Sequence, residues 1–129
     1  MPDSRTVLVV DDEASVLSLV NRVLSEAGYQ TVTAATGAEA LELVEKGSVP
    51  DLLLTDLRMP IMTGDELTAR LRQAHPMLKV LYLTGYSEQL FKEKPVLWKD
   101  EAFLDKPFTV RGLLEAVSLA LCGHTVPVV

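Results

Sequence analysis

A chain of 129 residues has the length of one domain and can bury a hydrophobic core that needs no stabilising cross-links. Its single cysteine cannot form an internal disulfide. The net charge of −6 leaves no basic surface for phosphates, so direct binding to nucleic acid is not expected. No apolar run approaches the roughly 18 residues of a membrane span, and no segment has the pattern of a secretory signal, so we expect a cytoplasmic protein that does not insert into membranes.

Five short runs of apolar or β-branched residues predict strands, and the first and third runs are apolar at consecutive positions. Consecutive apolar positions are typical of strands that are covered on both faces, which indicates a parallel sheet between helices. In chain order, the predicted strands cover residues 6–10, 30–35, 51–55, 79–84 and 102–104.

Apolar residues recur at helical spacing after the first strand and again near the end of the chain, which predicts amphipathic helices packed on the sheet. Thr36 with Glu39 and Thr63 with Glu66 match the capping box, in which the two side chains satisfy backbone donors at a helix start. These pairs predict the starts of the second and third helices. The two apolar stripes consist of Val16, Leu17, Val20, Val23 and Leu24, and of Val110, Leu113, Leu114, Val117, Ala120 and Leu121.

The fourth helix is expected to be short or broken. It should end near Lys94, because Pro95 lacks a backbone donor and disfavours helix in the residue before it. Strands that alternate with helices and are joined by right-handed crossovers form a doubly wound α/β sheet. This spacing leaves no room for a second domain, so residues 1–129 are interpreted as one domain with a core at about 6–121 and a tail at 122–129.

Ionisable and polar residues stand at the ends of several predicted strands. Asp11 and Asp12 follow the first strand, Asp56 follows the third, Thr84 ends the fourth, and Lys106 lies just past the fifth. Ligands of open α/β sheets bind beside the carboxyl ends of the strands. These five side chains are therefore expected to meet at one edge of the sheet.

Three carboxylates at one edge repel one another and raise each other's pKa unless a cation compensates. Mg2+ meets this need, because it prefers oxygen ligands and leaves coordination positions for water and a phosphoryl oxygen. With Mg2+ and the Lys106 ammonium group drawing charge away, Asp56 is expected to act as a nucleophile toward phosphorus. Thr84 would supply a hydroxyl donor to the phosphoryl oxygens.

Four segments of the chain, VLVVDDE, LLLTDLRMP, YLTGY and FLDKPF, resemble the signature segments of the response-regulator receiver domain of two-component signalling. The resemblance extends from about Thr6 to Leu121. It implies a flavodoxin-like fold with strand order 2-1-3-4-5 and helices on both faces. The segments TGYSEQ and FLDKPFT and the proline-broken fourth helix resemble the receiver modules of hybrid sensor histidine kinases more than those of transcription factors, which suggests a role in a phosphorelay.

The resemblance also implies roles for the residues at the strand ends. Asp56 would accept a phosphoryl group from the phosphohistidine of a histidine kinase or a histidine phosphotransfer protein. Mg2+ would be held by Asp12, by Asp11 through a water molecule, by the Asp56 carboxylate and by the main-chain carbonyl of Arg58. Lys106 would pair with the phosphoryl group. Such a domain is a signalling switch that catalyses only its own phosphorylation and dephosphorylation.

In the family, a threonine that turns toward the phosphoryl group is followed by the inward movement of an aromatic ring. Thr84 and Phe103 occupy these switch positions. The usual residue at the second position is tyrosine, so Phe103 departs from the pattern and has no hydroxyl to mark one of the two states. Arg58, Gly85 and Tyr86 fall at positions that tune the phosphoryl lifetime in relatives.

The resemblance finally implies a docking surface for the phosphodonor on the first helix and on the loop after the last strand. The peptide bond after Lys106 is often cis in the family, and X-Pro bonds carry a low cis penalty. A monomer or a weak dimer is expected. The candidate docking residues are Ser15, Leu19, Pro107 and Phe108.

Two alternatives remain open. The first is a Mg2+-dependent phosphohydrolase that uses an aspartyl-phosphate intermediate on small phosphate esters. Such hydrolases carry a second acid two residues after the nucleophile, where this chain has Arg58. The second is a degenerate receiver that never takes up phosphate, which the complete set of acids argues against.

Overall fold

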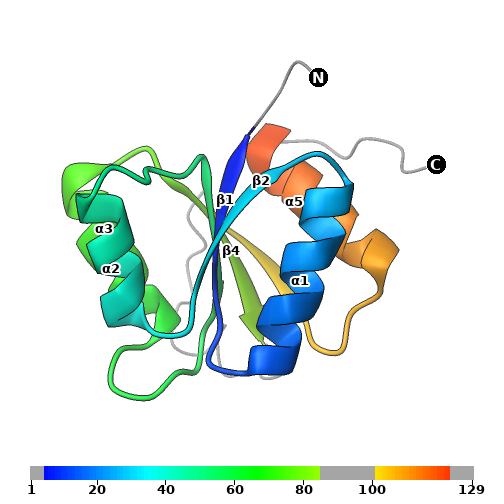
Figure 1. The fold of residues 1–129 in the computed structure, drawn as a ribbon, viewed down its shortest axis with the longest axis horizontal. Helices are drawn as coiled ribbons and strands as arrows, with labels where there is room; N and C mark the ends of the chain where they lie inside the picture. Colours follow the sequence, from blue (N-terminus) through cyan, green and yellow to red (C-terminus); the bar gives the residue numbers. More distant parts are fainter. Residues whose placement is uncertain (1–4, 85–100, 123–129) are drawn as a thin grey trace.

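A five-stranded parallel sheet forms the centre of the molecule, with strand order β2-β1-β3-β4-β5. The computed structural model describes residues 5–84 and 101–122 of the chain. This order confirms the predicted strand order. Figure 1 shows helices on both sides of the sheet, as the doubly wound arrangement requires. The strands are β1 (Thr6–Val10), β2 (Gln30–Ala34), β3 (Leu52–Asp56), β4 (Lys79–Thr84) and β5 (Glu101–Asp105).

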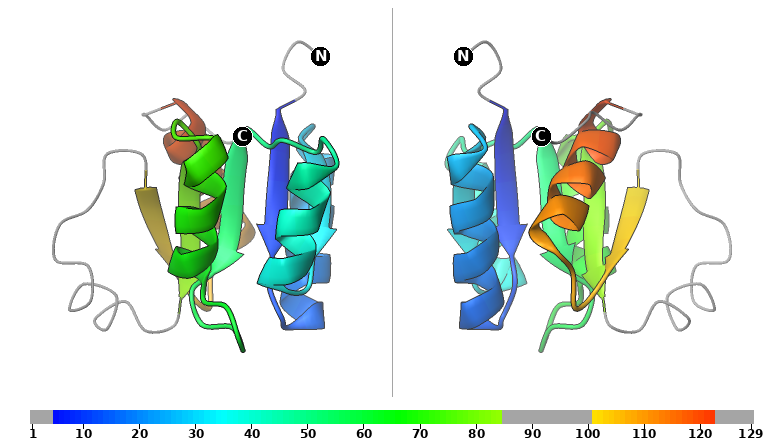
Figure 2. Two further views of the ribbon diagram at one scale, coloured as in Figure 1. Left: turned by 90° about the vertical axis from the view of Figure 1, so that its left-hand side faces the viewer. Right: turned by 90° about the vertical axis from the view of Figure 1, so that its right-hand side faces the viewer.

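Helices cover both faces of this sheet. Helices α1 (Ala14–Glu26) and α5 (Val110–Cys122) lie on one face, and α2 (Gly37–Glu45) and α3 (Gly64–Ala74) lie on the other (Figures 1 and 2). None of the helices in the described ranges has the length and apolar character needed to cross a membrane. The fourth helix, expected to end near Lys94, falls outside the described residues.

The core divides into two layers because neighbouring strand residues point to opposite faces. Val7 and Val9 of β1 pack in the layer under α1 and α5, whereas Leu8 and Val10 pack in the layer under α2 and α3. All four side chains are fully buried, as are Leu52, Leu53 and Leu54 of β3. The prediction of strands covered on both faces is therefore confirmed for β1 and β3.

Both helix starts predicted from capping pairs are confirmed. At α3, Glu66 N donates to Thr63 Oγ1 at 3.4 Å and Thr63 N donates to Glu66 Oε1 at 2.9 Å, which completes the reciprocal box. At α2, Glu39 N donates to Thr36 Oγ1, but the Glu39 carboxylate accepts from Ala35 N at 2.8 Å and not from the N-cap residue. The predicted box at Thr36 is thus only half formed.

Five strand boundaries differ from the predicted ones by a residue: β2 ends at Ala34, β3 is shifted to Leu52–Asp56, and β5 extends from Glu101 to Asp105. Strand β3 begins at Leu52 because the carboxylate of Asp51 turns to accept a hydrogen bond from Thr6 N at 2.8 Å. At its other end, β3 includes Asp56. The phosphoacceptor candidate therefore lies within the hydrogen-bonded ladder, opposite Leu83 of β4.

Candidate functional site

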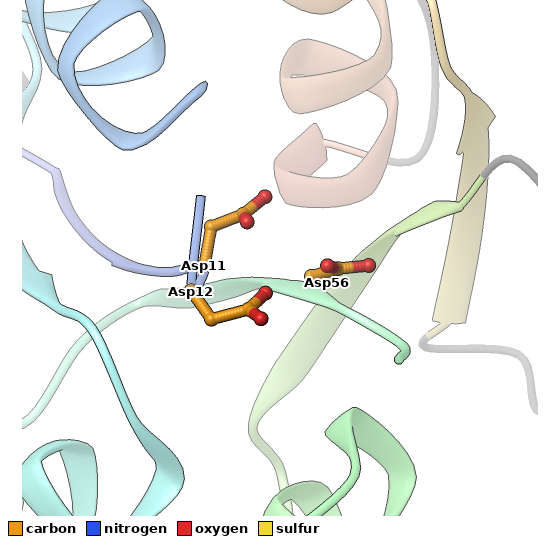
Figure 3. Close-up of side chains that lie close together, drawn as sticks. All are labelled: Asp11, Asp12 and Asp56. Atoms are coloured by element: carbon orange, nitrogen blue, oxygen red, sulfur yellow. The ribbon is translucent and has the colours of Figure 1, made fainter. Parts of the chain in front are cut away.

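Three carboxylates gather where β1 and β3 end. Asp11 and Asp12 directly follow β1, Asp56 is the last residue of β3, and one carboxylate oxygen from each lies within 4.8 Å of the others (Figure 3). Asp11 is held in place by two backbone bonds: its N–H donates to Ala34 O, and its Oδ1 accepts from Glu13 N at 2.8 Å. The ends of two neighbouring parallel strands thus bring the three acids together, as the sequence predicts.

Lys106 reaches this cluster from the loop after β5. Its Nζ lies 3.1 Å from Asp11 Oδ2, 3.1 Å from Glu13 Oε1 and 3.5 Å from Asp56 Oδ2. The Lys106-Pro107 peptide bond is cis. The ammonium group is therefore a common ionic partner of residues that follow β1 and end β3.

Burial raises the pKa of Asp56 to about 6, and the nearby charge of Asp11 adds to the increase. Lys106 and the backbone N–H of Arg58, which donates to Asp56 Oδ1 at 3.3 Å, oppose it without cancelling it. Burial likewise raises the pKa of Asp11, although the hydrogen bonds from Glu13 N and Lys106 partly offset the effect. The charged forms of both acids are therefore destabilised in the metal-free site.

Burial alone would lower the pKa of Lys106, but the hydrogen bond to Asp11, the charges of Asp11 and Asp56 and the bond to Glu13 outweigh it. The pKa of Lys106 is raised as a result. The lysine is therefore a permanent cation at neutral pH, and it lies beside the oxygen Asp56 Oδ2.

The donor set of the cluster fits Mg2+. All three side chains offer carboxylate oxygens, the ligands that this ion prefers, and Asp12 is exposed whereas Asp11 and Asp56 are 1% and 7% exposed. The raised pKa values of the two buried acids also show that one ammonium group does not fully compensate their charge. A further cation would remove this imbalance.

The two switch candidates lie on neighbouring strands. Thr84 is the last residue of β4, one position beyond the residue that pairs with Asp56, so its backbone stands at the same sheet edge. Phe103 lies in the middle of β5 opposite Tyr82, and their rings stack with centroids 5.5 Å apart and planes 16° apart. The modulating candidates Gly85 and Tyr86 fall outside the described residues, and Arg58 is exposed.

The docking candidates lie on α1 and on the loop after β5, which the ion pair between Lys106 and Glu13 connects. Ser15 and Leu19 are exposed on α1, which begins directly after Glu13. Pro107 is exposed and Phe108 is half-buried against the layer under α1 and α5.

Two residues of this region received no role from the sequence. Glu13 is a partner of Lys106, and its position next to the acid pair was the signal that could have indicated it. Tyr82 stacks on the ring of the switch candidate Phe103 and donates a hydrogen bond to Thr68 Oγ1 at 3.0 Å. The position of Tyr82 two residues before Thr84 predicts the same face of the sheet, but nothing local indicates Thr68 as its partner.

Comparison with known proteins agrees with this geometry. The family model of the response regulator receiver domain matches residues 7–118. The chain is 38% identical over 115 residues to the sensor kinase CckA of Brucella abortus (strain 2308), covering 88% of this chain but 12% of that kinase. It is 36% identical over 112 residues to sporulation initiation phosphotransferase F of Bacillus subtilis (strain 168), covering 86% of this chain and 89% of that protein.

Among solved structures, a response regulator receiver protein from Sinorhizobium medicae WSM419 superimposes with a TM-score of 0.81 at 30% identity. The alignment covers 94% of this chain and 97% of that one, so the likeness extends over the whole sheet and its helices. A family match over most of the chain, a shared fold and an acidic strand-end site agree with one another. The chain belongs to the response regulator receiver domain family.

Proposed function

We propose that Asp56 is the phosphoacceptor of a two-component phosphorelay and that Mg2+ is its cofactor. The observation that carries this proposal is the position of a buried carboxylate 3.5 Å from a lysine ammonium group and within reach of two further acids. Asp11, Asp12, Asp56 and the main-chain carbonyl of Arg58 would hold the ion. When bound, Mg2+ supplies positive charge to the oxygens of the phosphoryl group and of the acids.

In the transfer, a carboxylate oxygen of Asp56 attacks phosphorus while the phosphorus–nitrogen bond of the donor phosphohistidine breaks and its electron pair returns to the imidazole. Lys106 neutralises charge on the phosphoryl oxygens from its position beside Asp56 Oδ2. The N–H of Arg58 fixes the orientation of the Asp56 carboxylate by binding Oδ1. These residues thus orient the Asp56 carboxylate and neutralise charge on the phosphoryl group, and the carboxylate itself serves as the nucleophile.

Phosphorylation would bias a two-state equilibrium through Thr84 and Phe103, since a modification shifts such an equilibrium by its differential interaction with the two states. Thr84 would donate its hydroxyl to the phosphoryl group, and Phe103 would report the change to a protein partner. Arg58, Gly85 and Tyr86 would set the phosphoryl lifetime. This chain would catalyse only its own phosphorylation and dephosphorylation.

The phosphodonor would be a histidine kinase or a histidine phosphotransfer protein that docks on Ser15, Leu19, Pro107 and Phe108. The names of the relatives, a sensor kinase and a phosphotransferase, support a place in a relay. The chain spans 12% of the length of the first relative and 89% of the length of the second. We further propose a monomer or weak dimer in the cytoplasm, folded as one domain.

The experiment is intact mass measurement after incubation with Mg2+ and acetyl phosphate. The wild-type chain should gain one phosphoryl group, Asp56→Asn should gain none, and the control Asp51→Asn, which alters an exposed acid just before β3, should be labelled like the wild type. Labelling of Asp56→Asn, or none of the wild type, would contradict the proposal. Turnover of p-nitrophenyl phosphate would instead favour the hydrolase, which Arg58 at the second acid position argues against.

A further inference from the structure

Tyr82 is a tyrosine at the centre of the sheet with no exposed surface. A buried phenol needs a hydrogen-bond partner, because an unpaired hydroxyl in the core is costly. The Tyr82 hydroxyl donates to Thr68 Oγ1 on α3 at 3.0 Å, and Thr68 is itself buried. The ring of Tyr82 is thus fixed to β4 by its backbone and to α3 by its hydroxyl.

Phe103 lies against this fixed ring. The two residues are register partners on β4 and β5, and their rings stack at 5.5 Å with planes 16° apart. Phe103 is half-buried and packs on the layer under α2 and α3. Because its ring carries no hydroxyl, the orientation of Phe103 depends on packing, and Tyr82 provides a stacking surface for it.

The other end of the hydrogen bond leads toward Asp56. Thr68 Oγ1 donates to Gly64 O at 3.0 Å, and Gly64 N donates to Leu57 O at 2.8 Å. Gly64 packs so closely on the Asp56 carbonyl that a β-carbon there would overlap with it. The start of α3 is therefore seated directly on the end of β3.

We propose that Tyr82 is a positioning residue for the switch: its ring, anchored through Thr68 to the start of α3, holds Phe103 in the stacked orientation. The inference rests on the proposed function, which gives Phe103 its role. The hydroxyl missing from the switch position is replaced by one on the neighbouring strand, where it binds the helix that contacts the backbone of Asp56. Loss of the Tyr82–Thr68 bond should change the ratio of stacked to unstacked Phe103 about three- to tenfold, the effect of one hydrogen bond.

The test uses the full chain with 4-fluorophenylalanine incorporated only at position 103, through a reassigned stop codon, so that residues 29 and 82 carry no fluorine in any variant. Fluorine NMR then reports the environment of residue 103. Tyr82→Phe keeps the stacking ring and removes the hydroxyl, and Thr68→Val removes the partner at equal volume. Thr68→Ser keeps the hydroxyl and should retain the wild-type signal. The control is Tyr29→Phe, which makes the same chemical change at a half-buried tyrosine outside the stack.

Tyr82→Phe and Thr68→Val should each shift the residue 103 signal toward the unstacked position, and the double variant should shift it no further, since both remove one bond. Shifts no larger than in Tyr29→Phe, or additive shifts in the double variant, would overturn the proposal. Thermal melts identify any variant that fails to fold. If Thr68→Val fails, the residue 103 signal of Tyr82→Phe is compared with that of Thr68→Ser, and equal signals would overturn the proposal. Mass measurement of Asp56 phosphorylation in the same samples tests the proposed function separately from the role of Tyr82, because the fluorine signal of residue 103 is measured without phosphorylation.

Discussion

The environment of Asp56 disfavours the ionised form of its carboxyl group. Asp56 is 7% exposed, it lies near the charge of Asp11, and its pKa is raised from 3.8 to about 6. A buried carboxylate of this kind is poorly compensated without a metal, even with Lys106 beside it. A bound cation would therefore stabilise the charged form of this carboxylate.

The raised pKa has a consequence for the stability of the metal-free protein. Because the folded protein binds the proton of Asp56 more tightly than the unfolded chain does, this group contributes stability below about pH 4 and loses that contribution as the pH rises through about 6. A difference of about two pKa units corresponds to about 3 kcal/mol. In EDTA, Asp56→Asn should therefore gain up to about 3 kcal/mol relative to the wild type between pH 4 and pH 8.

Urea denaturation of both proteins across this pH range measures the difference. Glu45→Gln, which removes an exposed acid of α2, serves as the control and should give a difference that stays nearly constant. Saturating Mg2+ should shrink the pH-dependent part for Asp56→Asn, since the ion compensates the carboxylate in the wild type. A flat pH profile in EDTA would show that the environment of Asp56 does not oppose its charge.

The helices and strands differ in how far residues close in the sequence determine their placement. The start of α3 follows from Thr63 and Glu66, because the capping box involves residues three apart. The contact of α3 with the sheet is not local: Tyr82 meets Thr68 only because the helix is rotated so that this hydroxyl faces β4. Such a pairing depends on tertiary packing, so the sequence predicts the helix and leaves its partner open.

The same division applies to the site. The acids at the ends of β1 and β3 could be predicted, since parallel strands bring their carboxyl ends to one edge. The bond between Lys106 and Glu13 could not, because it depends on how the loop after β5 and the start of α1 fold beside each other. The expected residue types were sufficient to locate the site, whereas the details of its hydrogen bonds required the structure.

The first residue of α3 gives a prediction at this scale. A β-carbon at Gly64 would overlap with the backbone of Asp56 and Leu57, so one of the two elements must move. Gly64→Ala should lower the free energy of unfolding by about 2 kcal/mol or more and weaken Mg2+ binding. Gly37→Ala is the matched control, because Gly37 is also the first residue of its helix. A β-carbon added there would lie 2.7 Å from Met62 Sδ, which belongs to a flexible side chain that can move aside. Chemical denaturation and Mg2+ titration of both variants check this, and equal losses would contradict it.

The chain is acidic, with a net charge of −6, and the cluster of Lys106 with Asp11, Glu13 and Asp56 joins segments that are distant in the sequence. Lys106 and Asp11 are separated by 95 positions in the sequence, yet Lys106 Nζ lies 3.1 Å from Asp11 Oδ2. Their ion pair therefore connects the loop after β5 to the end of β1. Because the pKa of Lys106 is raised, the lysine keeps its charge until the pH rises above 10.5, whereas at low pH its ion pairs weaken as the carboxylates of Asp11 and Asp56 become protonated. The chemistry of the site is therefore also part of what holds the sheet edge together.

Lys106→Met should consequently destabilise the metal-free protein at pH 7 by about 3 kcal/mol, because removing one partner leaves buried carboxylates uncompensated. The loss should shrink at pH 5, where protonation of Asp56 and Asp11 becomes easier as their pKa values are raised, and saturating Mg2+ should restore part of it. Lys46→Met is the control: its ion pair with Glu42 spans 3.8 Å on the exposed surface of α2 and should contribute under about 0.5 kcal/mol. Urea denaturation at both pH values, with EDTA or Mg2+, measures these terms. A loss in Lys106→Met no larger than in Lys46→Met would mean that the acids compensate one another without the lysine, and the electrostatic account of the site would fail with it.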